Sequence, residues 1–233
     1  MKAKKIHYIL GIVASIALIV VLLITSFEIA AYSDYGWYEK EYLKYKVLED
    51  LEMELEDAMH VTEEMMAYLR GNREDLVVDT IVDGDSREFF NDREKAHMID
   101  VKNLFLGGMD LRLGAGVALI VCLVILIFSR ADWKKILPKS ILLGVSGFVV
   151  LLGIFAGLIA TNFNKYFVMF HEIFFDNDLW ILDWRTDLLI RMLPEGFFFD
   201  MVVRISIIFA LLLTTVLLIS VIVLRKQKNK KNL

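Results

Sequence analysis

The sequence has 233 residues, of which 57% are hydrophobic and 24% charged, with a mean hydropathy of +0.56. Soluble domains are usually nearer half apolar, so this composition argues against an ordinary soluble domain and for a chain partly solvated by lipid. The single cysteine, Cys122, excludes an internal disulfide and a thiolate metal motif. The net charge of −4 says little about the class of protein, because acidic and basic residues are concentrated in different parts of the chain.

Four apolar segments are each close to the roughly 20 residues that a helix needs to cross hydrocarbon. They are residues 6–31, 113–128, 141–161 and 201–224. The first is too long for the apolar part of a signal peptide, and no cleavage site follows it. The sequence therefore predicts an all-α membrane protein with four transmembrane helices.

Basic residues gather in the short segments that flank these spans. The N-terminal tail, residues 130–139 and residues 225–233 carry 3, 4 and 5 Lys or Arg residues. Residues 32–111 instead carry 21 acidic and 9 basic residues, and residues 162–200 carry 7 and 3. By the positive-inside rule, both termini are predicted to be cytoplasmic and the two longer segments extracytoplasmic.

This topology divides the chain into eight parts. In chain order they are a cytoplasmic tail with the first span (1–31), a small α+β extracytoplasmic domain (32–111), the second span (112–129), a cytoplasmic loop (130–139), the third span (140–161), an extracytoplasmic interfacial segment (162–200), the fourth span (201–224) and a basic cytoplasmic tail (225–233). The basic tail is expected to anchor the last helix at anionic lipid, and we expect no nucleic-acid binding.

The larger outer segment begins with a helical pattern. Apolar residues recur every three or four positions over residues 39–69, which predicts one long amphipathic helix. Its other face is rich in glutamate, as in a solvated surface; a docking surface for a basic partner is the alternative.

A hairpin and a second helix are predicted to follow. Residues 76–82 alternate and are β-branched, Asp83-Gly84 is a hairpin turn signal, and residues 86–90 are the expected return strand. Asn91, with Glu94 three positions later, resembles a capping box. It predicts a helix over residues 92–105 that leads to the second span.

The smaller outer segment, residues 162–200, is unusually aromatic for a loop. Aromatic side chains favour the headgroup interface, where an apolar body and a polar tip are both satisfied. We predict an aromatic-rich, membrane-hugging outer loop, partly helical around residues 165–174 and 187–193, that caps the helices and meets lipid-linked molecules.

Two of the four histidines, His97 and His171, fall in the two outer segments. An imidazole with its usual pKa near 6.5 is a natural proton carrier at neutral pH. Each histidine has a carboxylate close in sequence, and Asp100, one helical turn from His97, is expected to fix the tautomer of its ring. Taken singly, either histidine is as well explained by a structural role.

Other chemistries fit the sequence less well. His171-Glu172 is not followed by the second histidine of an H-E-x-x-H zinc motif, although a scattered site with His97, His171 and an aspartate stays open. The only serine near paired glycines, Ser146, lies inside the third span and lacks the nucleophile-elbow pattern. After the zinc and serine motifs are set aside, general acid–base catalysis by histidine is the chemistry that fits the sequence best.

Two segments resemble the signatures of the lipoprotein intramolecular transacylase family of bacterial integral membrane proteins. They are residues 93–102 (REKAHMIDVK) and residues 170–183 (FHEIFFDNDLWILD), the second continuing to DLLI at 187–190 and LPE at 193–195. The four-span plan is also similar, so the resemblance covers essentially the whole chain. Trp184 departs from the pattern, where the family is expected to favour proline.

The resemblance implies an acyltransferase in the bacterial cell membrane, active on the extracytoplasmic side. Its substrate is a diacylglyceryl lipoprotein, whose sn-2 acyl chain moves to the N-terminal cysteine amine to give the lyso-form. Nucleophile and ester belong to one molecule, so no cofactor and no metal are implied. The partners are the lipoprotein and membrane lipids; a monomer is compatible with this reaction, and the oligomeric state is left open.

The resemblance also implies catalytic roles for His97 and His171. We expect His171 to take the proton of the attacking amine and His97 to assist at the leaving oxygen, the reverse assignment being the alternative. Arg93 and Lys102 are candidates to stabilise the oxyanion, and Asp100, Glu172 and Asp178 to orient the rings. The supporting residues in full are Arg93, Glu94, Asp100, Lys102, Tyr166, Glu172, Asp178 and Asp183. A membrane lipase or metal-dependent hydrolase, and a non-enzymatic sensor or assembly partner that uses the acidic outer domain, are the rival functions.

Overall fold

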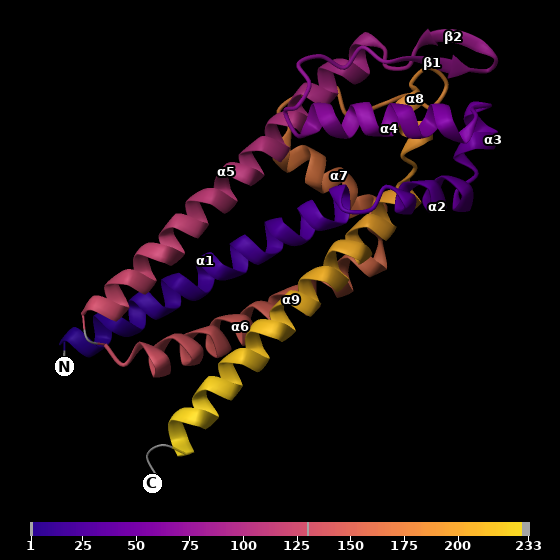
Figure 1. Cartoon of the computed structure of the whole chain (residues 1–233). Helices are drawn as coiled ribbons and strands as arrows, with labels where there is room; N and C mark the ends of the chain where they lie inside the picture. The colour runs from indigo at the N-terminus through magenta and orange to yellow at the C-terminus, as the bar shows by residue number, and fades with distance from the viewer. Residues whose placement is uncertain (1, 130, 230–233) are drawn as a thin grey trace. The chain divides into compact units, whose positions relative to one another are not determined.

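A computed structural model describes residues 2–129 and 131–229 (Figure 1). Arg130 of the predicted cytoplasmic loop and the last four residues of the predicted basic tail lie outside the described residues. The chain forms two units. We call Met1–Glu28, Met109–Thr161 and Ile205–Leu233 the membrane unit, and Ile29–Gly108 with Asn162–Arg204 the globular unit.

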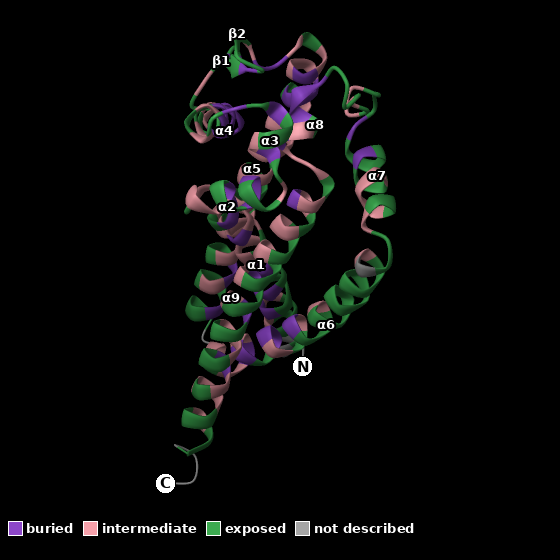
Figure 2. Ribbon diagram, turned by 90° about the vertical axis from the view of Figure 1, so that its right-hand side faces the viewer, coloured by how far each residue is buried: buried purple, intermediate pink, exposed green. Residues whose placement is uncertain are grey.

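The membrane unit consists of the four long apolar helices that the sequence predicts. They are α1 (Lys2–Tyr32), the second half of α5 (Asp92–Phe128), α6 (Trp133–Thr161) and most of α9 (Glu195–Asn229). Each is long and apolar enough to cross a membrane. Only 11–33% of the residues in their most apolar windows are buried, and Figure 2 shows exposed residues along most of α6. Such apolar exposure is expected where lipid is the solvent.

Contacts within the membrane unit join α1 to α6 and α5. At Gly144 of α6 an added Cβ would collide with the Ser15 side chain of α1, so this glycine allows close packing of the two helices. Gly147, further along α6, has nothing within 4 Å of such a Cβ. Glu28, an isolated acid near the end of α1, forms an ion pair with Arg112 of α5, which satisfies its charge.

The globular unit holds the main buried core. It contains α2 (Gly36–Lys44), α3 (Val47–Leu51), α4 (Leu55–Leu69), β1 (Asp79–Val82), β2 (Asp85–Glu88), α7 (Phe163–Phe174), α8 (Leu188–Met192) and the first half of α5. Its largest buried apolar side chains come from α2 and from the turn before α5, and they include Tyr38, Tyr42, Phe89 and Phe90. Sequence-distant segments therefore share one core around α5 and α8.

The predicted single helix over residues 39–69 is wrong. The segment is three helices, α2, α3 and α4, separated at Lys46 and Glu52. Both residues have positive φ angles, 56° and 47°, which a continuing α-helix does not allow. The two turns let α2 bury Tyr38 and Tyr42 beside Phe197 of α9. Tertiary packing thus overrides the helical periodicity. The glutamate face of α4 is solvated, as predicted, at Glu56 and Glu63.

The predicted hairpin is confirmed with shorter strands. Asp83 and Gly84 have φ angles of 53° and 80°, the two positive values that a tight hairpin turn requires. Strand β1 pairs antiparallel with β2, Asp79 opposite Glu88. The return strand stops two residues earlier than predicted, because Phe89 and Phe90 turn into the core.

The capping box at the start of α5 is confirmed. The Asn91 side chain accepts from the Glu94 backbone N–H at 3.0 Å, and the Asn91 N–H donates to Glu94 Oε2 at 2.8 Å. The helix then continues without a break to Phe128, beyond the predicted end at 105. Its first half carries many charges and cannot lie in hydrocarbon, so His97 lies outside the spanning part. The predicted helices in residues 162–200 are present as α7 and α8.

Candidate active site

The globular unit brings the two predicted histidines together. His97 lies on the second turn of α5 and His171 near the end of α7, and their ring centroids are 6.1 Å apart. The two residues are 7% and 8% exposed, although 74 positions separate them in the sequence. Two titratable rings that share one buried site form the best candidate for a catalytic centre here.

Aromatic side chains surround the histidine pair. The ring of His171 lies 4.3 Å from that of Phe167 and 4.9 Å from that of Trp180, between centroids. Phe175 contacts both imidazoles, at 5.3 Å from His97 and 5.5 Å from His171. This apolar surround disfavours the charged form of either ring.

A backbone carbonyl fixes the tautomer of His171. Its Nδ1 is 2.7 Å from the carbonyl oxygen of Phe167, one turn earlier in α7. A carbonyl oxygen only accepts, so Nδ1 carries the hydrogen, and in the neutral ring Nε2 keeps its lone pair. Burial lowers the pKa of His171, and the bond to Phe167 opposes that shift. His171 is therefore a neutral ring with a free acceptor nitrogen at neutral pH.

His97 is neutral at pH 7 for a related reason. Its pKa is lowered to about 4, chiefly by burial and to a smaller extent by His171 and Arg93, while Asp100 acts in the opposite direction. Its Nδ1 is buried and has no hydrogen-bond partner. A buried polar atom without a partner is costly, so this nitrogen is suited to a group that arrives with a substrate.

Asp100, the expected orienting partner of His97, has a different partner for one of its oxygens. Its Oδ2 accepts from the side-chain amide of Asn177, at 2.8 Å. The orphan Nδ1 of His97 is not held by this carboxylate. Asp100 instead fastens the loop that follows α7 to the helix that carries His97.

Arg93 likewise contacts the loop after α7. Its guanidinium donates to the backbone carbonyl of Asp178 and lies 3.8 Å from the Asp178 carboxylate. Asp178 is exposed, and so is Glu172, which follows His171. Neither carboxylate has the buried position expected of a group that orients an imidazole.

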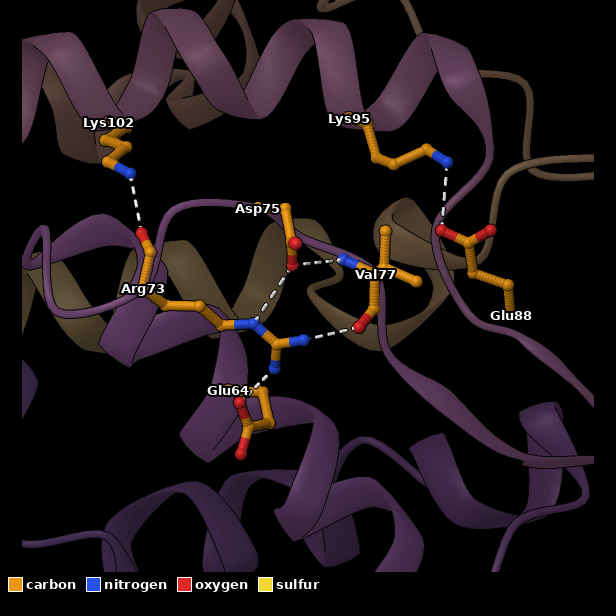
Figure 3. Close-up of polar contacts among 7 residues, drawn as sticks. All are labelled: Glu64, Arg73, Asp75, Val77, Glu88, Lys95 and Lys102. Atoms are coloured by element: carbon orange, nitrogen blue, oxygen red, sulfur yellow. Dashed lines mark hydrogen bonds and ion pairs between the residues drawn. The ribbon is translucent and has the colours of Figure 1, made fainter.

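Lys102, a candidate for stabilising the oxyanion, is engaged elsewhere (Figure 3). Its Nζ donates to the backbone carbonyl of Arg73 at 2.8 Å and lies 4.0 Å from the centroid of the Tyr68 ring. Arg73 in turn bonds Glu64, Asp75 and the carbonyl of Val77. Lys102 therefore closes a structural network between α5 and the segment after α4.

The remaining supporting candidates serve local structure. Asp183 accepts from the backbone N–H of Arg185 at 3.0 Å and so shapes a turn. Tyr166 is half-buried on α7, with Lys165 Nζ 6.0 Å from its ring centroid. In residues 2–129 and 131–229, no three His, Cys, Asp or Glu side chains are grouped as metal ligands.

Glu94 links the N-termini of two helices. Its side chain is fully buried, and its two oxygens accept from the backbone N–H groups of Asn91, at 2.8 Å, and of Leu189 in α8, at 2.6 Å. Asp187 joins the same junction by accepting from the Asn91 amide and from the Asp183 N–H. Sequence reasoning missed Asp187 and Asn177, although both lie in or next to the second signature.

We expect Glu94→Ala to destabilise the globular unit by about 2–4 kcal/mol, because two buried N–H groups would lose their acceptor. A lower midpoint of thermal unfolding in detergent would measure the effect. Glu63→Ala on the exposed face of α4 is the control and should leave the midpoint unchanged. Equal midpoints for both variants would contradict this role of Glu94.

Solved structures of one membrane-integral protein share this fold. The structure of the membrane-integral lipoprotein intramolecular transacylase Lit from Bacillus cereus matches with a TM-score of 0.80 and 18% identity, over 97% of this chain and 99% of that chain. Two structures of the same protein, in which one histidine is replaced by arginine or by alanine, each match with a TM-score of 0.73 and 17% identity. They cover 98% and 97% of this chain, and 96% and 97% of theirs.

No curated protein matches the sequence significantly. The model of the family described as lipoprotein intramolecular transacylase Lit matches residues 12–198, most of the chain and both segments that carry the histidines. The four apolar helices, the shared fold and this match agree, and the chain belongs to the lipoprotein intramolecular transacylase Lit family.

Proposed function

We propose that this acyltransferase moves the sn-2 acyl chain of a diacylglyceryl lipoprotein onto the amine of its own N-terminal cysteine, with His171 as the base. The observation that carries the assignment is the bond between His171 Nδ1 and the Phe167 carbonyl, which leaves Nε2 as an acceptor. The same carbonyl stabilises the imidazolium that forms when Nε2 takes a proton.

The reaction needs only groups that the substrate and the two histidines supply. The cysteine nitrogen attacks the ester carbonyl, a C–N bond forms, and the amine proton goes to His171 Nε2. The tetrahedral intermediate then releases the glycerol oxygen, which takes that proton back, and the product is an amide and a free sn-2 hydroxyl. Because amine and ester belong to one molecule, holding them in contact can supply several kcal/mol of the barrier.

His97 acts in this scheme as a neutral hydrogen-bond donor. Its lowered pKa makes it a weak candidate for a cationic acid at neutral pH. A neutral imidazole N–H can still stabilise a developing oxyanion without carrying a charge. The orphan Nδ1 supports this role, because an oxyanion would give that buried atom the partner it lacks. We therefore propose that the assistance expected of His97 is stabilisation of the oxyanion and not proton transfer.

The exposed side of α7 supports approach of the substrate from the membrane. Met169, Phe170, Ile173 and Phe174 are 41–67% exposed on the helix that carries His171. Apolar and aromatic side chains of this kind favour the headgroup interface. We infer that α7 lies in the outer leaflet interface and meets the lipoprotein ester there. The Lys and Arg distribution in the connecting segments supports an extracytoplasmic active site with both termini in the cytoplasm.

Mass spectrometry of a lipoprotein N-terminus tests this function. Expression of the chain in a bacterial host that makes diacylglyceryl lipoproteins and lacks this activity should convert the N-terminal peptide to an N-acylated lyso-form of the same total mass. Release of free fatty acid with loss of one acyl mass would instead identify a lipase, and inhibition by a chelator a metal-dependent hydrolase. An unchanged N-terminus, with the protein present in the membrane, would contradict the proposal.

A further inference from the structure

The loop between α7 and α8 is fastened to the helix that carries His97. The Asn177 side-chain N–H donates to Asp100 at 2.8 Å, and Arg93 donates to the carbonyl of Asp178. The other end of the Asn177 amide accepts from the backbone N–H of Leu179, at 3.0 Å. One side chain thus donates to a carboxylate and accepts from a backbone amide, which an asparagine side chain can do at the same time.

The same loop carries the indole that contacts His171. Trp180 Nε1 donates to the carbonyl of Asn177 at 2.9 Å, and the indole lies 4.9 Å from the His171 centroid at an interplanar angle of 31°. A chain of contacts therefore runs from Asp100 through Asn177 and Trp180 to the His171 ring. It links the helix that carries His97 to the His171 ring, in addition to the 6.1 Å approach of the two imidazoles.

The ring of His171 has one polar anchor, the Phe167 carbonyl. A single bond at Nδ1 leaves the ring free to tilt about that bond, which would swing Nε2 away from the reacting amine. The rings of Phe167 and Trp180, whose centroids lie 4.3 Å and 4.9 Å from that of His171, restrict that tilt. Since a misplacement of about 1 Å can cost roughly 100-fold in rate, this restraint has a catalytic consequence.

We propose that Trp180 is a positioning residue for the His171 ring and that Asn177 and Asp100 hold Trp180 in place. This inference rests on the proposed role of His171 as the base. The second signature, residues 170–183, would then do more than supply His171: it would also hold the His171 ring in its reactive orientation.

Removal of the indole should also change the proton affinity of His171. The nearest titratable group that the contacts show is His97, 6.1 Å away between ring centroids, and Asp100 and Arg93 lie on the same helix as His97. Glu172 on α7 and Asp176 and Asp178 on the loop are exposed. None of them is removed with Trp180. Water would enter instead, and the charged imidazole would be less disfavoured. The pKa of His171 should then rise toward the ordinary value, so that more of the base is protonated at a given acidic pH.

The experiment compares Trp180→Ala, Trp180→Phe and Trp184→Ala in the full-length protein in detergent. Trp184 is the matched control, since it lies on the same loop and is 67% exposed. Trp180→Ala should lower kcat about 10- to 100-fold with little change in KM, whereas Trp180→Phe keeps an aromatic ring beside His171 and should keep most of the activity. The Trp184→Ala variant should behave as the parent protein.

A second readout separates positioning from folding. Diethyl pyrocarbonate modifies neutral imidazole, and mass spectrometry can follow its addition to His171 against pH. The midpoint should shift to higher pH in Trp180→Ala and stay in place in Trp184→Ala. If Trp180→Ala has the parental modification midpoint for His171, or the parental kcat, the proposal is wrong. The proposed function is tested separately, by the His171→Ala variant.

Exchange of the two polar partners tests the anchor. Asn177→Asp alone puts two carboxylates together and should reproduce part of the Trp180→Ala defect. Combining it with Asp100→Asn restores a donor and an acceptor in reversed order and should recover activity. A double variant no better than Asn177→Asp would refute the role of this pair.

Discussion

Replacing His171 by alanine is expected to lower the rate of acyl transfer by roughly 10²- to 10⁴-fold, the range that a positioned general base contributes. The bond from Nδ1 to the Phe167 carbonyl commits Nε2 to accepting a proton, and burial keeps the ring neutral at pH 7. The N-acylated fraction of a lipoprotein N-terminus, measured by mass spectrometry over time, gives the rate.

Two variants control for the loss of a histidine or of a nearby charge. His60→Ala removes an exposed histidine of α4, and Glu172→Gln neutralises the exposed carboxylate next to His171. Both should keep the parental rate and the parental amount of protein in the membrane. Full activity of His171→Ala would exclude His171 as the base, and inactivity of Glu172→Gln would transfer that role to a carboxylate.

Local chemistry explains what the sequence predicts well. The four long helices are predictable because apolar segments of this length form helices that cross a lipid bilayer. The start of α5 follows from Asn91 and Glu94, because a capping box needs only residues three positions apart. The turn at Asp83-Gly84 follows from two residues that tolerate positive φ. Each of these predictions depends only on residues that are close together in the sequence.

Packing at long range explains what the sequence does not predict. The breaks at Lys46 and Glu52 interrupt a regular helical pattern, and neither residue is a typical helix breaker. In the first of the three helices, Tyr38 and Tyr42 are buried against Phe197, more than 150 positions away. No pattern within residues 39–69 records that contact.

The same distinction holds within the candidate site. The resemblance selects His97 and His171, and the fold brings their rings together, whereas their catalytic roles stay predictions. Asp100 is the expected partner of His97 because it lies one turn away, yet Asn177, 77 positions later, takes its carboxylate. Spacing on a helix identifies possible partners, and competition among all polar groups in the fold decides between them.

Replacing His97 by alanine is expected to lower the rate about 10²- to 10³-fold, the typical loss when one donor to an oxyanion is removed. The partner-free Nδ1 and a pKa lowered to about 4 indicate a neutral donor. Hydrogen-bond donation by His97 and proton transfer by His97 predict different activities for the His97→Asn and His97→Gln variants. The asparagine amide can occupy the place of Nδ1 and donate, whereas the glutamine amide reaches the place of Nε2.

If His97 stabilises the oxyanion through Nδ1, the rate should therefore rank as parent, then His97→Asn, then His97→Gln and His97→Ala. An amide cannot carry a proton to the leaving oxygen, so equal inactivity of all three variants would show that His97 transfers protons. The pH dependence gives an independent criterion. Protonation of His97 near pH 4 removes no donor hydrogen, whereas protonation of His171 removes the base. The loss of rate on acidification should follow His171 and should be unchanged in His97→Asn, because the donor in that variant does not titrate.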